Sequence, residues 1–176
     1  AQYDLPIWIH PFRPLNLDDY KKYFVNHIFG WPYESSAAMA YLILDGLFDR
    51  FPGIKIIIHH CGAMVPFFAA KIQGGYDAGG AIHGMQCEGL KKPLLDYFKM
   101  FYTDTAISGG TSGLMCGYDF FGADHLLFGT DMPYDSEHGS RLIRETIQSV
   151  EQMTISDLEK QLIYEGNATR LLGLTT

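Results

Sequence analysis

The stretch "IKIIIHH" (Ile54–His60) is a short apolar run that stops at two adjacent histidines. Its consecutive isoleucines favour a β-strand, because β-branched side chains pack well on a pleated surface. A run that is apolar at nearly every position is typical of a strand buried on both faces, as in a parallel sheet. The stretch therefore predicts an internal strand of an α/β protein, with polar chemistry at the point where the strand ends.

The same pattern recurs along the chain. Three further runs are "LPIWIH" (Leu5–His10), "MFYTD" (Met100–Asp104) and "HLLFGTD" (His125–Asp131). Segments with helical spacing separate the runs, so we expect strands that alternate with helices around a parallel sheet. The length of 176 residues predicts one domain.

Three segments between or after the runs predict helices, namely 35–52, 110–124 and 155–174. Ser35 is a candidate N-cap for the first of them, and Ser156 and Asn167 are candidates for two short helices in the last. Residues 73–92 are rich in glycine and predict no regular element. A connection of that length is expected to be a functional lid or a mobile segment.

The composition excludes several classes of protein. Thirteen Lys and Arg residues stand against 20 Asp and Glu, which gives a net charge of −7. Such a chain is poorly suited to nucleic acids or to acidic membrane surfaces, and no apolar run approaches the roughly 18 residues of a membrane-spanning helix. Cys61, Cys87 and Cys116 form no CxxC pair. We therefore expect free thiols in a cytoplasmic protein that binds neither nucleic acid nor membranes.

Each predicted strand ends in a side chain that can bind a metal or move a proton. These residues are His10, His59 or His60, Asp104 and Asp131. In parallel α/β architectures the reactive groups lie at the carboxyl ends of the strands. Imidazole nitrogen and carboxylate oxygen are ligands of Zn²⁺ in hydrolytic sites, and one further neutral imidazole can act as a general base. The sequence therefore predicts a metal-dependent catalytic site at this edge of the sheet.

Five motifs, taken in order, resemble the amidohydrolase-related (amidohydrolase 2) family of metal-dependent TIM-barrel enzymes. The motifs are "PIWIHP", "KIIIHHCGAMVPFF", "FYTDTA", "LLFGTDMPYD" and "GNATRLLGL". This family contains aminocarboxymuconate semialdehyde decarboxylase and γ-resorcylate decarboxylase. The resemblance implies a (β/α)₈ TIM barrel of which residues 1–176 form the C-terminal portion, roughly strands 5 to 8 with their helices. The family's first-strand His-x-His or Glu-x-His pair is absent from this sequence, so a missing N-terminal half of the barrel or a partner chain is implied as well.

The resemblance also implies roles for individual residues. His10 falls at the position of the family's metal-ligating histidine on the fifth strand, and Asp131 at its metal-associated aspartate. The spacing to Gly62 and Pro66 assigns the family's catalytic histidine to His60. The implied catalytic residues are thus His60 and Asp131, and the implied metal ligands are His10 and Asp131.

Other residues are candidates for binding substrate. Arg13 can pair with a substrate carboxylate, with a surface salt bridge as the alternative. Trp31 and His27 can form a wall against the substrate, with plain packing as the alternative. His59 is expected to point away from His60 and to be hydrogen-bonded under a helix, because consecutive residues of a strand face opposite sides.

The resemblance implies a metal-dependent carboxy-lyase or hydrolase. Decarboxylation of a small aromatic or unsaturated carboxylic acid, with His60 as general base, is the preferred interpretation. Hydrolysis of a lactone, ester or amide is the first alternative, and a catalytically inert half-barrel that only packs with a partner chain is the second. The implied cofactor is a divalent metal, with Zn²⁺ ahead of Mn²⁺ or Mg²⁺, and the implied assembly is a homo-oligomer.

Overall fold

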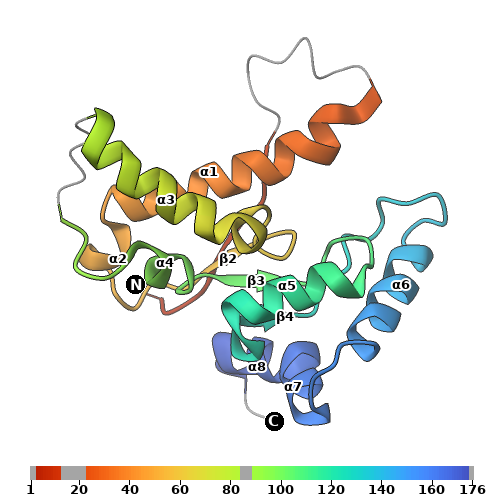
Figure 1. Cartoon of the computed structure of the whole chain (residues 1–176). Helices are drawn as coiled ribbons and strands as arrows, with labels where there is room; N and C mark the ends of the chain where they lie inside the picture. The colour runs from red at the N-terminus through yellow and green to blue at the C-terminus, as the bar shows by residue number, and fades with distance from the viewer. Residues whose placement is uncertain (1–2, 13–22, 84–88, 175–176) are drawn as a thin grey trace.

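The computed structural model describes residues 3–12, 23–83 and 89–174 (Figure 1). Within these residues four parallel strands form one sheet in the order β1-β2-β3-β4. The strands are β1 (Ile7–Ile9), β2 (Ile56–Ile58), β3 (Tyr102–Asp104) and β4 (Leu126–Leu127). Each lies inside one of the four apolar runs, which confirms the predicted strands and the parallel α/β class.

The register of the sheet brings all carboxyl ends to one edge. Ile9 pairs with Ile58 of β2, and Asp104 at the end of β3 pairs with Leu127 of β4. β2 is buried along its whole length, as its apolar sequence predicts. β1 is the first strand of the sheet and is largely exposed, with Trp8 at 52%. Its outer side therefore presents an open sheet edge.

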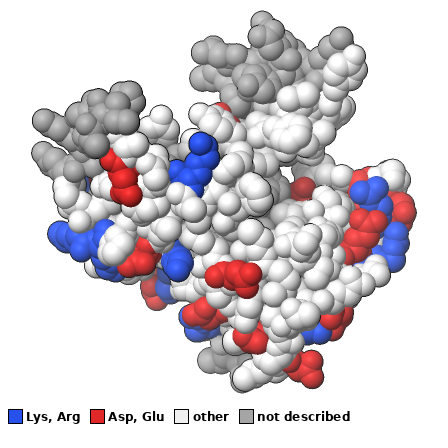
Figure 2. Space-filling view, viewed as in Figure 1, with Lys and Arg blue, Asp and Glu red and all other residues white. Residues whose placement is uncertain are grey.

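Helices flank the strands, with α1 to α4 toward the first strands and α5 to α8 toward the last (Figure 1). The helical elements are η2 (Asn26–Gly30), α1 (Trp31–Leu44), α2 (Leu47–Arg50), α3 (Val65–His83), α4 (Leu94–Phe98), α5 (Thr111–Phe121), η3 (Ala123–His125), α6 (Ser140–Glu151), α7 (Asp157–Gln161), η4 (Leu162–Gly166) and α8 (Asn167–Leu172). None of the helices in the described part of the chain is both long and apolar enough to cross a membrane. Figure 2 shows that acidic and basic side chains are interspersed on the face drawn there.

The sequence misplaced the start of one helix and missed another helix. α1 begins at Trp31 rather than near Ser35, because a π-helical turn, η2, leads directly into it and Pro32 occupies its first turn. Ser35 is consequently buried inside the helix. The helix of the glycine-rich region was also missed, since α3 continues to His83. The rest of that region includes residues 84–88, which lie outside the described residues.

Of the two N-caps predicted for the C-terminal helices, one is confirmed and the other is wrong. Ser156 caps α7 in a capping box with Glu159. Asn167 caps no helix, because the π-helical turn η4 runs into α8 without a break. Its buried amide instead donates to the carbonyls of Ala123 and Leu126, at 2.7 Å each. Asn167 therefore fastens the last helix to the segment that leads into β4.

Candidate functional site

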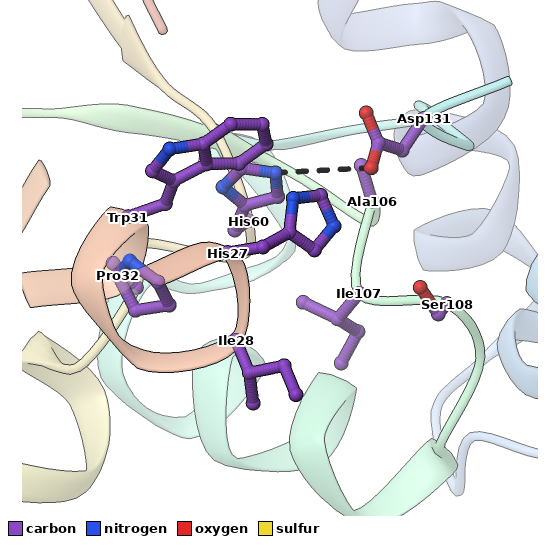
Figure 3. A pocket seen from close by; sticks show the side chains of 10 residues that line it. His27, Ile28, Trp31, Pro32, His60, Ala106, Ile107, Ser108 and Asp131 are labelled. Atoms are coloured by element: carbon purple, nitrogen blue, oxygen red, sulfur yellow. Dashed lines mark ion pairs between the residues drawn. The ribbon is translucent and has the colours of Figure 1, made fainter. Parts of the chain in front are cut away.

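Three side chains from three strand ends converge at the carboxyl edge of the sheet. His10 follows β1, His60 follows β2 and Asp131 follows β4. One ligand atom from each lies within 4.8 Å of the other two. His60 Nε2 is 4.0 Å from Asp131 Oδ2, the contact drawn dashed in Figure 3. The parallel strands, in a sheet curved enough to bring the ends of its outer strands together, thus gather the three residues to which the resemblance assigned metal binding and catalysis.

An unusual turn aims His60 into the site. His60, Cys61 and Ala63 all have positive φ angles, of 61°, 54° and 57°, and Gly62 between them has a φ of 74°. A Cβ on Gly62 would lie 2.4 Å from the ring of Phe121, so only glycine fits there. Non-glycine residues in left-handed conformations are sparsely populated and cluster at functional sites. Asp131 adopts the same conformation, with φ of 60°.

This turn overturns the expected orientation of His59. The strand ends at Ile58, so the alternation of side chains does not extend through the histidine pair. His59 and His60 have ring centroids 5.7 Å apart, and the ring of His10 is 4.9 Å from that of His59. His59 also stacks on Trp8, with centroids 5.6 Å apart. Both histidines therefore border the same site, and the expected place of His59 under a helix is wrong.

Asp104 holds the turn in place, a role that the sequence did not predict. Its side chain is 1% exposed, and Oδ1 accepts hydrogen bonds from the backbone N–H groups of His60 at 2.8 Å, Cys61 at 3.3 Å and Ala106 at 3.1 Å. Oδ2 lies 2.8 Å from His59 Nδ1, but the alignment is not that of a hydrogen bond, so this is a close polar contact. The sequence feature that could have indicated this role is the carboxylate at the end of the strand that follows the histidine pair along the chain.

The environment of His60 favours its neutral form. Burial is the largest influence on its pKa and lowers it below the ordinary histidine value. The neighbouring His59 and His10 lower the pKa further, and the nearby Asp104 and Asp131 carboxylates only partly oppose this. A neutral imidazole can accept a proton, so His60 is suited to act as a base.

A cleft of about 390 Å³ opens beside these residues. Its polar lining consists of His27, His60, Ser108 and Asp131, and its other lining residues are Ile28, Trp31, Pro32, Ala63, Ala106 and Ile107 (Figure 3). Trp31 begins α1, and its ring lies 5.5 Å from that of His10 and 4.3 Å from that of His27. Arg13, the other predicted substrate-binding residue, lies outside the described residues. The size and mostly apolar lining suit a small organic ligand.

The amidohydrolase family model matches residues 1–174, almost the entire chain. The chain belongs to the amidohydrolase family. This confirms the resemblance seen in the strand-end motifs of the sequence.

Relatives of this amidohydrolase chain include decarboxylases of carboxylic acids. γ-Resorcylate decarboxylase from Polaromonas sp. (strain JS666) is 28% identical over 97% of this chain and 51% of the relative. The 2-amino-3-carboxymuconate-6-semialdehyde decarboxylase of Dictyostelium discoideum is 26% identical over 96% of this chain and 45% of the relative. The chain thus spans about half the length of these curated relatives.

Solved structures agree with these matches. The 5-carboxyvanillate decarboxylase of Sphingomonas paucimobilis superposes with a TM-score of 0.83 at 26% identity, over 99% of this chain and 51% of that structure. A dihydroxybenzoic acid decarboxylase from Polaromonas sp. JS666 was solved with manganese and 2-nitroresorcinol. It gives a TM-score of 0.81 at 28% identity, over 98% of this chain and 51% of that structure. The amidohydrolase chain therefore has the fold of about half of a TIM barrel.

Proposed function

We propose that this chain forms the C-terminal portion of a metal-dependent decarboxylase for small aromatic or unsaturated carboxylic acids. The observation that carries the proposal is the convergence of His10, His60 and Asp131 beside a largely apolar cleft that His60 and Asp131 line. The relatives named as decarboxylases of carboxylic acids support the choice of reaction. Decarboxylation needs a polar end that binds the reacting carboxylate and an apolar surface that contacts the rest of the acid, and the lining of the cleft offers both.

His10 and Asp131 are the residues that would hold the metal. Their ligand atoms lie close enough to share an ion, and imidazole nitrogen with carboxylate oxygen is a donor set that Zn²⁺ and Mn²⁺ both accept. A divalent ion bound there would polarise the substrate carboxylate and lower the pKa of a bound water. The ligand types predict Zn²⁺, while Mn²⁺ is the ion in the structure of the Polaromonas relative, and Mg²⁺ is the third candidate.

His60 is the proposed general base and proton shuttle. Decarboxylation breaks the bond between the carboxylate and the carbon that bears it, and that carbon takes up a proton as CO₂ leaves. His60 can take up a proton from solvent at Nε2 and deliver it to this carbon, because Nε2 faces the cleft beside Asp131. Asp131 would orient the imidazole and stabilise its protonated form. Asp104 would fix the position of His60 through the backbone of the turn.

The partner of this half-barrel is part of the proposal. The exposed edge of β1, with Ile7 at 48% and Trp8 at 52%, is where the remaining strands of the barrel would pair. We propose that the N-terminal half of the barrel, in the same chain or a second one, covers this edge and supplies further metal ligands. A homo-oligomer and a cytoplasmic location remain predictions from the sequence.

A metal assay combined with a CO₂ assay tests the role of His60. If His60 is the base, His60→Ala keeps the metal of the complete barrel and loses about 10²- to 10⁴-fold in CO₂ release. Metal lost together with activity would make His60 a ligand instead, a role that its distance to His10 and Asp131 also permits. His138→Ala, which alters an exposed histidine of the same loop as Asp131, is the matched control. Unchanged CO₂ release in His60→Ala would contradict the proposal.

The same assay separates the alternatives. Hydrolysis of a lactone, ester or amide by the metal-bound water would show as product from those substrates without CO₂. An inert half-barrel would bind its partner chain but neither retain metal nor turn over any acid, lactone, ester or amide.

A further inference from the structure

The cleft holds a second imidazole that the proposed chemistry does not use. His27 is exposed and lines the cleft together with His60 and Asp131. Figure 3 shows its ring directed into the space that His60, Asp131 and Ile107 surround. It is not part of the group of ligand atoms formed by His10, His60 and Asp131. Its side chain can therefore meet a ligand without competing for the metal.

The local backbone holds this ring in place. His27 belongs to the π-helical turn η2, in which the N–H of Trp31 donates to the carbonyl of Asn26, five residues earlier. Such turns are rare and occur frequently at functional sites. The His27 ring packs against Trp31 at 4.3 Å and meets the edge of Phe24 at 6.1 Å, measured between centroids. These aromatic contacts orient the imidazole, while hydrogen bonds to the described residues do not occupy its nitrogens.

The cleft lining also separates two polar regions. His60 and Asp131 lie at the strand ends, where the reacting carboxylate would bind. Ile28, Pro32 and Ile107 provide the apolar surface that a flat ring would contact. Away from the strand ends, the polar side chains that line this cleft among the described residues are those of His27 and Ser108. The imidazole is the larger of these two and the one held by aromatic neighbours.

We infer that His27 determines specificity by hydrogen bonding to a polar substituent on the substrate ring, such as a hydroxyl group. The inference rests on the proposed function, because it takes the reacting carboxylate to lie at the end of the cleft that His60 and Asp131 line. An acid without the substituent leaves the imidazole to water, so it still binds but more weakly. His27 is thus a substrate-contacting residue whose removal changes which acids bind, rather than whether acids bind.

Binding calorimetry with benzoate, 3-hydroxybenzoate and 4-hydroxybenzoate tests this on the complete, Mn²⁺-loaded barrel. We expect at least one hydroxybenzoate to bind about 2- to 10-fold more tightly than benzoate, the range of one neutral hydrogen bond. His27→Phe keeps the contact with Trp31 but removes the nitrogens, and should abolish this preference while benzoate affinity changes less than about twofold. His27→Gln should restore part of the preference. Phe29→Ala, on the same turn but not lining the cleft, is the control.

The outcomes separate this inference from the proposed function. A preference that survives in His27→Phe, an equal loss for all three acids, or no preference in the unaltered protein would overturn the inference. Release of CO₂ from an acid alongside any of these results would leave the proposed function intact. Binding that depends on His27 without CO₂ release from any acid would refute decarboxylation and leave the contact standing. No binding of any acid would contradict both.

Discussion

Replacing Asp104 with alanine should destabilise the protein by about 3–5 kcal/mol. The carboxylate is 1% exposed and accepts three backbone hydrogen bonds through Oδ1. A hydrogen bond to a charged acceptor contributes about 1.5–3 kcal/mol, and its loss leaves a buried N–H without a partner. The expected loss is smaller than the sum of three such contributions, because hydrogen bonds that share one acceptor are not additive. The same change releases the left-handed turn that carries His60 and should lower CO₂ release.

Asp104→Asn is the matched control for this prediction. Asparagine retains an oxygen that can accept the three backbone hydrogen bonds, loses the charge, and places an NH₂ group where Oδ2 faces His59, so we expect a cost of about 1–2 kcal/mol. Equilibrium unfolding in urea, followed by tryptophan fluorescence, measures both free energies of unfolding. If Asp104→Ala lay within 1 kcal/mol of the unaltered protein, or if both variants were equally destabilised, the carboxylate would not be what holds the turn.

Three further predictions concern the same framework. Gly62→Ala should lower the free energy of unfolding by about 2–4 kcal/mol in a denaturant titration, because the new side chain would combine a φ of 74° with a clash against Phe121. A loss below 1 kcal/mol would contradict the requirement for glycine at this position. Asn167→Ala should lower the free energy of unfolding by about 2–3 kcal/mol, because the carbonyls of Ala123 and Leu126 lose their buried donor. An unchanged free energy of unfolding would show that water replaces the amide. Hydrogen bonds from Ser156 and Tyr118 hold the pKa of Glu159 below its ordinary value. The stability that Glu159 adds is therefore present above about pH 4.5 and is lost as pH falls through its folded-state pKa. The difference in unfolding free energy between the unaltered protein and Glu159→Gln should shrink from pH 7 to pH 3, and a constant difference would refute it.

The strands and their polar ends could be predicted because they depend on local patterns. Runs such as Ile56–Ile58 combine β-branched residues with burial, and a parallel sheet gathers its carboxyl ends at one edge. That topology places His10 and Asp131 at the same edge of the sheet. Because β1 and β4 are its outer strands, their close approach also depends on the curvature that the barrel fold gives the sheet.

The orientation of the histidine pair could not be predicted in the same way. It depends on a left-handed turn that is held by the Asp104 carboxylate, 44 residues from His60, and by the ring of Phe121 against Gly62. Strand alternation stops where such a turn begins, and the sequence does not mark that point. The start of α1 could have been predicted from the sequence, because proline is common in the first turn of a helix and Pro32 occupies that place.

The metal content of the complete barrel tests whether His10 and Asp131 hold a catalytic ion. We expect about one divalent ion per barrel by elemental analysis, with loss of that ion in both His10→Ala and Asp131→Ala and its retention in His138→Ala. Full metal occupancy in His10→Ala and Asp131→Ala would contradict the assignment of these two residues, and no metal in the unaltered protein would contradict the proposed metal-dependent chemistry itself.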